Sequence, residues 1–375
     1  MDFHFHMPVR VVSGPGCVRQ RMGELREYGR RCLIITGQNS AMRSGALDDA
    51  MAALTDAGVD CTVFPGIGAN PLISQCQAAA FAAEACRADF LVGIGGGSVL
   101  DATKAAAWIA ENTTADVERL FAGTYKYAPL PFALVGLTAG TGSEVSPVAV
   151  LTGDQDGRKR SVSDPCCYAR AAYADPRYTC TMSAATTVST ALDALCHGAE
   201  GFLNPVCTDV ADLFASRALP LLSGGLIELA GGAAAEPTMG LREQLFYGAL
   251  WAGMVLNAMG TAYPHPLGYV LTEDFDVPHG MACAVFLPDL LRRSEAGLPE
   301  RTARFYSLVG GKEAFHQALD LLVTADIRMT MGQVEDYARR WDPASDGAEP
   351  KNFARVAGGF TAADARDLFA ELFVR

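Results

Sequence analysis

Short apolar runs alternate with helical patterns from residue 31 to residue 137, and this alternation constrains the fold of the chain more than any other feature. Residues 31–37, RCLIITG, read as a buried strand, and residues 45–58 carry the pattern of the helix after it. The series continues with predicted strands at 61–67, 90–97 and 130–137 and predicted helices at 73–88 and 98–111. Continuous apolar strands alternating with helices predict a mostly parallel sheet covered by helices on both faces.

The pattern changes after residue 147. Two short runs flank a Gly-containing polar turn in residues 148–164, which predicts a β-hairpin, and residues 169–178 predict one last strand. From about Ser183 the strand signals end and helix-period patterns continue to the C-terminus. A chain of 375 residues exceeds one simple core. We therefore predict two domains, an α/β domain at 1–181 and an all-α domain at 182–375.

Two loops rich in glycine and hydroxyl side chains follow strands of the predicted sheet. The first, GIGGGSVLDATK from Gly93, opens a helix, so its backbone N–H groups and the helix dipole suit a pyrophosphate. Its sequence fits neither a P-loop nor the usual GxGxxG pattern, and Ser98 with Asp101 forms a capping-box pattern. The second, residues 137–146, offers the hydroxyls of Thr138, Thr141 and Ser143. Both loops at the carboxyl edge of one sheet predict a dinucleotide site there, although the first could also be only a tight turn.

Three of the six histidines, together with one acid, form a candidate metal site in the helical half. Asp193 and His197 are four residues apart and share a helix face, and His265 and His279 follow further along the chain. One carboxylate and three imidazoles suit a borderline divalent ion such as iron, zinc, nickel, cobalt or manganese, and leave a position for a substrate. Each residue taken singly could instead have a purely structural role.

Composition excludes some partners. The formal net charge of −12 argues against nucleic acid, which favours a basic face. We expect no membrane span, because no apolar run approaches about 18 residues. We also expect no secretory signal, and the scattered eleven cysteines indicate reduced thiols and a cytoplasmic location.

Four segments together resemble the iron-containing (group III) alcohol dehydrogenases. They are residues 95–104, 138–146, 175–202 and 265–280, and the resemblance covers nearly the whole chain in one order. It implies an N-terminal dinucleotide-binding α/β domain and a C-terminal helical domain. The residues carried over from the family pattern are the metal ligands Asp193, His197, His265 and His279, the pyrophosphate loop Gly95, Gly96, Gly97 and Ser98, Asp101 near the nicotinamide, and Thr138 and Thr141 in the second cofactor loop.

The chain departs from the family pattern at two positions. Many members have a histidine four residues after the third ligand, where this chain has Tyr269, which either relays protons or packs. NAD-preferring members often have an acid after the first strand, where this chain has Gly37 followed by small polar residues including Asn39 and Ser40. A carboxylate would repel a 2′-phosphate, so Gly37 slightly favours NADP(H) over NAD(H).

The resemblance implies a metal-dependent, NAD(P)-linked alcohol dehydrogenase or aldehyde reductase. Hydride would pass between nicotinamide C4 and a small alcohol or aldehyde whose oxygen is bound to the metal, with Fe²⁺ as the first choice. Tyr269 joins the four ligands as a candidate catalytic residue, and the chain is expected to form a homodimer or larger homo-oligomer. The alternatives are a metal- and NAD-dependent lyase similar to the dehydroquinate synthases, which share the superfamily, and a non-catalytic cofactor-binding relative.

Overall fold

The computed structural model describes residues 3–112, 118–233, 236–345 and 347–374. These residues divide into two compact units. The sheet unit contains residues 6–183 and 238–257, and the helical unit contains residues 184–237 and 258–375 together with the first residues of the chain. The main division lies two residues from the domain boundary predicted from the sequence, but residues 238–257 belong to the sheet unit.

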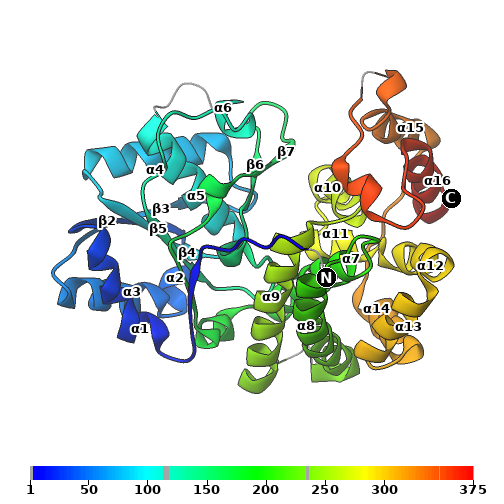
Figure 1. Cartoon of the computed structure of the whole chain (residues 1–375), viewed down its shortest axis with the longest axis horizontal. Helices are drawn as coiled ribbons and strands as arrows, with labels where there is room; N and C mark the ends of the chain where they lie inside the picture. Colours follow the sequence, from blue (N-terminus) through cyan, green and yellow to red (C-terminus); the bar gives the residue numbers. More distant parts are fainter. Residues whose placement is uncertain (1–2, 113–117, 234–235, 346, 375) are drawn as a thin grey trace. The chain divides into compact units, whose positions relative to one another are not determined.

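The sheet unit has the predicted parallel sheet with helices on both faces (Figure 1). The strand order is β1-β8-β5-β4-β2-β3, and every pairing is parallel. Helices α1 and α3 lie on one face of the sheet, and α4 and α5 lie on the other. The elements are β1 Arg10–Ser13, α1 Cys17–Arg21, β2 Arg31–Gly37, α2 Ser40–Arg43, α3 Ala46–Asp56, β3 Asp60–Ile67, α4 Ile73–Ala85, β4 Phe90–Gly95, α5 Gly97–Asn112, α6 Glu118–Phe121, β5 Phe132–Gly136 and β8 Ala171–Ala174.

The central strands form because their sequences are apolar throughout. All residues of β4, β5 and β8 are buried, as expected for parallel strands covered on both faces. The core on one face combines Ile34, Val92 and Val135 of the strands with Leu54 of α3 and Met22 from the short 3₁₀ helix Met22–Tyr28. The predicted hairpin is also present, as antiparallel β6 Val148–Thr152 and β7 Lys159–Ser163.

The sequence analysis did not predict two features of this unit. Residues 10–13 form an edge strand of the sheet, where β1 pairs with β8. The helix α9, Met239–Met259, has most of its length in the sheet unit because it packs against the second glycine-rich loop. A Cβ atom on Gly253 of α9 would lie 2.6 Å from the Cα atom of Gly142, so this contact depends on two glycines.

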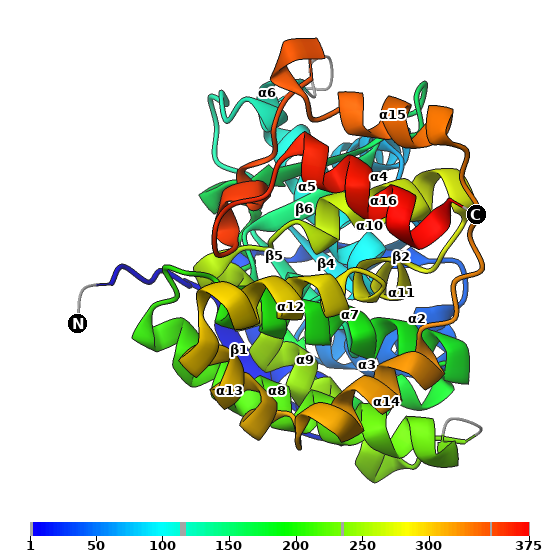
Figure 2. The same ribbon diagram turned by 90° about the vertical axis from the view of Figure 1, so that its right-hand side faces the viewer.

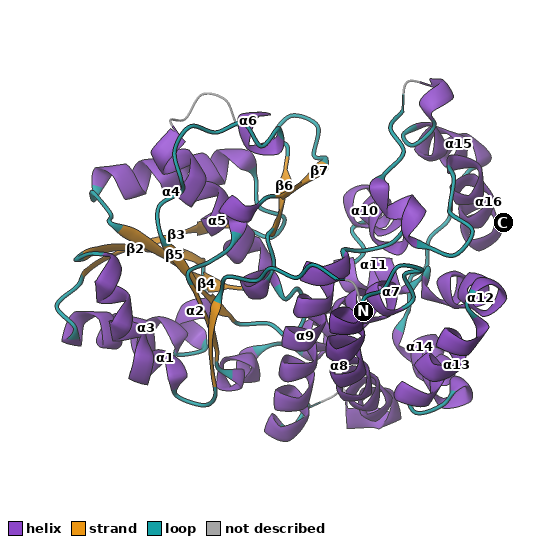
Figure 3. Ribbon diagram, viewed as in Figure 1, coloured by secondary structure: helices purple, strands orange, loops and turns teal. Residues whose placement is uncertain are grey.

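The helical unit contains no strand among its described residues (Figure 3). Helix α7 packs against α8 and α11, and α10 packs against α11 (Figure 2). Its helices are α7 Ala184–Phe202, α8 Asp209–Glu228, α10 Pro264–Phe275, α11 His279–Ala284, α12 Leu287–Gly297, α13 Pro299–Leu308, α14 Lys312–Leu322, α15 Met331–Arg339 and α16 Ala362–Phe373.

One helical stretch of the described chain, residues 209–232, is long and apolar enough to cross a membrane by length and composition alone. In this unit 44% of its most apolar window is buried inside the protein. Core helices of globular proteins pass the same test, so the stretch is weak support for a membrane span.

Candidate metal centre and nucleotide-binding loops

Helix α7 carries three ionisable residues on one face of its buried part, residues 191–202. Asp193, His197 and Glu200 are spaced i, i+4 and i+7, so their side chains leave the helix in the same direction. All three are buried, with exposed fractions of 4%, 6% and 1%. Burying polar groups is costly unless they are paired or bind an ion, so this face requires a specific partner.

Two further histidines meet this face from α10 and α11. The Nε2 atoms of His197, His265 and His279 lie 3.8, 3.6 and 3.8 Å from the Oδ1 atom of Asp193. These separations are too long for good hydrogen bonds. They match the roughly 3.3–3.8 Å expected between ligands bonded at about 2.0–2.3 Å to one tetrahedral ion. The structure thus brings together the four residues that the sequence predicted as ligands.

A glycine permits the close approach of His279 to α7. A Cβ atom on Gly280 would lie 1.8 Å from the carbonyl oxygen of Ser189 and 2.7 Å from the backbone nitrogen of Asp193. Any side chain at this position would push α11 away from α7. The His279 side chain keeps 29% of its exposure, against 5% for that of His265, so solvent reaches the histidine cluster at His279.

The charges around the cluster favour a cation. Burial would raise the pKa of Asp193, but the imidazoles of His197, His265 and His279 lower it well below its usual range. Burial would lower the pKa of His265, but Glu200 and Asp193 raise it to about 10. A metal ion bound to His265 would take the place of this proton, because either one balances the negative charge of Glu200 and Asp193.

Two buried polar atoms of the cluster lie 3.6 Å from each other. Neither Asp193 Oδ1 nor His265 Nε2 has a hydrogen-bond partner among the described residues, although both are fully buried. Such atoms are rare in folded proteins and call for a bound ion or water as their partner. Together with the nitrogen-and-oxygen donor set, they fit a divalent cation.

Glu200 is a site residue that the sequence analysis missed. One carboxylate oxygen lies 2.6 Å from His265 Nδ1, and the other accepts the backbone N–H of Ala262 at 2.5 Å. A carboxylate only accepts, so His265 donates to Glu200 from Nδ1, and an ion beside Asp193 would take the place of the second proton, on Nε2. The signal was present, because Glu200 shares the i, i+4, i+7 face with Asp193 and His197.

Tyr269 and Cys283 also lie beside His279. The ring of Tyr269 stacks on the imidazole, with centroids 5.5 Å apart and an interplanar angle of 24°. Its packing role is therefore visible, and its role in proton transfer stays a prediction. The Sγ atom of Cys283 lies 3.8 Å from both ring nitrogens of His279.

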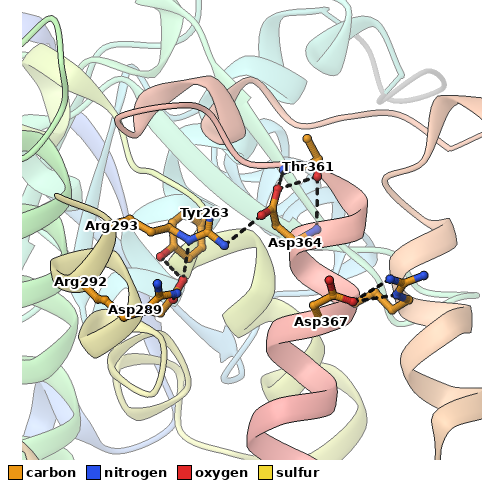
Figure 4. Close-up of polar contacts among 8 residues, drawn as sticks. Tyr263, Asp289, Arg292, Arg293, Thr361, Asp364 and Asp367 are labelled. Carbon is orange, nitrogen blue, oxygen red and sulfur yellow. Dashed lines mark hydrogen bonds and ion pairs between the residues drawn. The ribbon is translucent and has the colours of Figure 1, made fainter. Parts of the chain in front are cut away.

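A polar network fixes the start of α10, two residues before His265 (Figure 4). The Tyr263 hydroxyl donates to Asp289 of α12 at 2.7 Å. Arg293 donates to Asp289 at 2.9 Å and to Asp364 of α16 at 3.0 Å. Helices α12 and α16 thereby hold the N-terminus of α10, which positions the ligand that this helix carries.

The predicted nucleotide-binding residues lie in the sheet unit. Strand β2 has β3 on one side and β4 on the other, so the chain changes direction between β2 and β4. Ligands of parallel sheets bind at the carboxyl ends of the strands beside such a switch point. Gly37 ends β2, Gly95 ends β4 and Gly136 ends β5, so Gly37 and both glycine-rich loops lie at this edge.

The two glycine-rich loops contact each other. A Cβ atom would lie 3.1 Å from the Thr138 side chain if added to Gly96, and 2.5 Å from the Thr141 side chain if added to Gly97. One on Gly95 would lie 2.4 Å from the Cβ atom of Val99. The glycines are therefore required for this packing, which leaves the N–H groups at the start of α5 at the edge of the sheet.

The predicted capping box of Ser98 and Asp101 is wrong. Helix α5 begins at Gly97, so Ser98 lies inside its first turn, and its hydroxyl accepts the N–H of Asn70 at 3.2 Å. The Asp101 carboxylate is buried and accepts from the Ser143 hydroxyl at 2.6 Å and from the Val150 N–H at 2.8 Å. The physical reason is Lys104, a buried cation 3.7 Å from Asp101 that requires a counter-charge.

Asp101 and Ser143 thus hold the two loops together. Both side chains contact Lys104, whose Nζ atom lies 3.7 Å from the Asp101 carboxylate and donates to the Ser143 hydroxyl at 2.7 Å. By contrast, Asn39 and Ser40 at the end of β2 are exposed. These two are the most exposed of the predicted cofactor residues, and a further group is partly exposed: Gly37, Gly96, Gly97, Ser98, Thr138 and Thr141.

Comparison with known proteins supports one family over nearly the whole chain. A family model described as iron-containing alcohol dehydrogenase matches residues 8–176, and one described as Fe-containing alcohol dehydrogenase family, C-terminal, matches residues 187–335. The 1,3-propanediol dehydrogenase of Klebsiella pneumoniae is 31% identical over 321 residues, which cover 82% of this chain and 79% of that protein.

Two further comparisons agree. The NAD-dependent methanol dehydrogenase of Bacillus methanolicus is 27% identical over 82% of this chain and 80% of its own length. The crystal structure of an iron-containing alcohol dehydrogenase from Thermotoga maritima superposes with a TM-score of 0.89 at 29% identity, covering 99% of each chain.

Proposed function

Because this chain belongs to the iron-containing alcohol dehydrogenase family, we propose that it transfers hydride between a nicotinamide dinucleotide and a small alcohol or aldehyde at a divalent-metal site. It is an oxidoreductase that acts on a CH–OH group. The observation that carries the metal part of the proposal is the arrangement of three imidazole nitrogens 3.6–3.8 Å from one buried oxygen of Asp193.

The proposed ligands are Asp193, His197, His265 and His279. Fe²⁺ is the first choice because of the family, and Zn²⁺, Ni²⁺, Co²⁺ and Mn²⁺ suit the same donors. An ion bound there supplies a Lewis acid for the substrate oxygen. Glu200 holds His265 in the tautomer that donates the Nε2 lone pair, and Tyr263 with its network fixes the helix that carries it.

The glycine-rich loops are the proposed dinucleotide site, and the bound cofactor supplies or accepts the hydride. The N–H groups of Gly97 and Ser98, at the positive end of α5, bind the pyrophosphate. Asp101 and Ser143 keep the second loop in place beside the first. Tyr269, stacked on His279, is the proposed protein group for proton exchange, with water as the other route.

We also propose a size class for the substrate and a choice of dinucleotide. The names of two relatives specify methanol and 1,3-propanediol, which supports a small substrate here. One relative is named NAD-dependent, so NAD(H) is a proposed cofactor, while Gly37 supports the use of NADP(H). A cytoplasmic location and a homo-oligomer remain parts of the proposal.

The Glu200→Gln variant tests the metal site through a residue that does not touch the ion. Glutamine keeps the shape but loses the charge that orients and polarises His265, so we expect metal affinity to fall about 10–100-fold. Competition with a chelator on metal-free protein measures this affinity. The variant Glu144→Gln removes an equally buried carboxylate from the sheet unit and should leave the affinity unchanged. Equal affinity of Glu200→Gln and the unmodified protein would contradict the role of Glu200.

Loss of NADH or NADPH absorbance with a short aldehyde such as propanal tests the activity directly. We expect reduction by protein loaded with Fe²⁺ or Zn²⁺, loss of reduction after a chelator, and recovery when the ion is added back. Reduction that a chelator does not affect would remove the metal from the mechanism. Bound metal and bound nucleotide without turnover of any short alcohol or aldehyde would favour the lyase or the non-catalytic alternative.

A further inference from the structure

The peptide group between Thr261 and Ala262 lies just before helix α10, which carries the predicted ligand His265. Its N–H, on Ala262, donates to one carboxylate oxygen of Glu200 at 2.5 Å, and the other oxygen of Glu200 lies 2.6 Å from His265 Nδ1. Among the described residues these are the two hydrogen bonds of that carboxylate. The orientation of this one peptide group therefore helps to determine where the carboxylate lies beside the imidazole.

Two side chains hold the other edge of the same peptide group. The Thr261 carbonyl oxygen accepts from Arg355 Nη1 at 3.1 Å and from Asn352 Nδ2 at 3.0 Å, so both of its lone pairs are used. Asn352 Nδ2 also donates to the Thr261 hydroxyl at 2.6 Å. The peptide bond is trans, so its C=O and N–H point in opposite directions. The two donors and Glu200 thus lie on opposite sides of one peptide group.

A short 3₁₀ helix, Lys351–Arg355, presents both donors together. Residues i and i+3 of such a helix lie one above the other, so Asn352 and Arg355 leave it on the same face. Phe353, between them, is buried and packs edge-on against Phe360, with ring centroids 4.9 Å apart. This aromatic contact anchors the helix that carries the two donors.

The guanidinium of Arg355 lies against bare backbone at Gly260. A Cβ atom on Gly260 would lie 2.1 Å from Nη1 and 2.7 Å from Cζ of Arg355, and the φ of +68° at this position also favours glycine. Arg355 is partly buried and makes no ion pair with any residue of the described chain. Burial lowers its pKa, and the negative charge of Glu200 acts against this change. The positive charge therefore acts on the Thr261 carbonyl and, across the peptide group, on Glu200.

We propose that Arg355 and Asn352 are positioning residues for the metal ligand His265. They act through the peptide group of residues 261–262 and through Glu200. Hydrogen bonds in a chain polarise one another, so two donors on the carbonyl strengthen the N–H that holds the carboxylate. Glu200 in turn engages Nδ1 of the imidazole and leaves Nε2 to the ion. This inference rests on the metal site of the proposed function and extends its support to the C-terminal part of the chain.

The metal affinity of the full-length protein tests the proposal without an activity assay. Metal-free protein is titrated with Zn²⁺ in competition with a chromophoric chelator, and circular dichroism checks the fold of each variant. Loss of a direct partner of a ligand costs about 10–100-fold in affinity, and Arg355 is one step further away, so Arg355→Ala should cost about 3–10-fold. Arg355→Lys keeps the charge and a donor for the Thr261 carbonyl and should recover most of this loss. Asn352→Ala removes a neutral donor and should cost less than Arg355→Ala.

A double-mutant cycle shows whether Arg355 acts through Glu200. If it does, Arg355→Ala should add little to the loss of affinity caused by Glu200→Gln, because residues of one network are not additive. General destabilisation of the helical unit would instead lower the affinity by the same factor in both backgrounds. The control is Arg304→Ala, which removes an arginine of α13 that donates to Asp212 of α8 in the same unit. It should leave the affinity unchanged.

The outcomes separate this inference from the proposal on which it rests. Unmodified protein that binds no Zn²⁺ would overturn the metal site and this inference with it. Unchanged affinity in both Arg355→Ala and Asn352→Ala, or equal losses from Arg355→Ala with and without Glu200→Gln, would overturn the positioning role alone and leave the four predicted ligands in place.

Discussion

Replacing Asp193 by alanine is expected to remove both the bound ion and the activity. Asp193 Oδ1 is the atom that three imidazole nitrogens approach within 3.6–3.8 Å, so its loss removes the only carboxylate in the predicted ligand set. Lewis-acid stabilisation is worth several kcal/mol, and each 1.36 kcal/mol is a factor of ten in rate, so kcat/KM should fall by about 1,000-fold or more. Metal content by elemental analysis and NAD(P)H-linked aldehyde reduction measure the two effects.

A matched control separates this effect from a general loss of a polar side chain. His316 of α14 lies near Tyr306, with a ring nitrogen 3.1 Å from its hydroxyl, and belongs to none of the groups assigned to the metal or the nucleotide. His316→Ala should therefore keep both metal and activity. If Asp193→Ala retained a full equivalent of metal and normal turnover while folded, the histidine cluster would need another explanation.

The sequence predicted the sheet because its information is local. Residues 31–37, 90–97 and 130–137 are predominantly apolar, and they form β2, β4 and β5 within two residues of the predicted ends. Strand β1 was harder to predict, because RVVS becomes a strand of this sheet only by pairing with β8, which is far away in sequence. The placement of α9 depends on the contact between Gly142 and Gly253, which no periodicity records.

The candidate site was likewise predicted where its signal is local in the sequence. Scarcity of histidine and the i, i+4 spacing were enough to select Asp193 and His197, and the structure brings His265 and His279 to them. Glu200 could have been found by extending the spacing to i+7 on α7.

Replacing Gly37 by aspartate is expected to reverse the proposed tolerance for NADPH. Gly37 ends β2 at the carboxyl edge of the sheet, where an acid binds the adenosine ribose hydroxyls in NAD-preferring folds of this kind. Two negative charges about 5 Å apart repel by roughly 3 kcal/mol at an effective dielectric constant of 20, before screening by salt. The ratio of kcat/KM for NADPH to that for NADH should therefore fall about 100-fold.

The structure indicates that this variant folds. A Cβ atom on Gly37 would lie 3.4 Å from the carbonyl oxygen of Ile67 and 3.7 Å from the Ser40 hydroxyl and the Val99 side chain, which are ordinary contacts. Gly37→Asn adds the same bulk without the charge, so its cofactor ratio should change much less. Steady-state kinetics with both cofactors at two salt concentrations measure the effect, because the electrostatic part should weaken as salt increases. An equal shift in the aspartate and asparagine variants would mean that steric bulk, and not charge, controls the choice at this position. An unchanged ratio in both would place the adenosine ribose away from the end of β2.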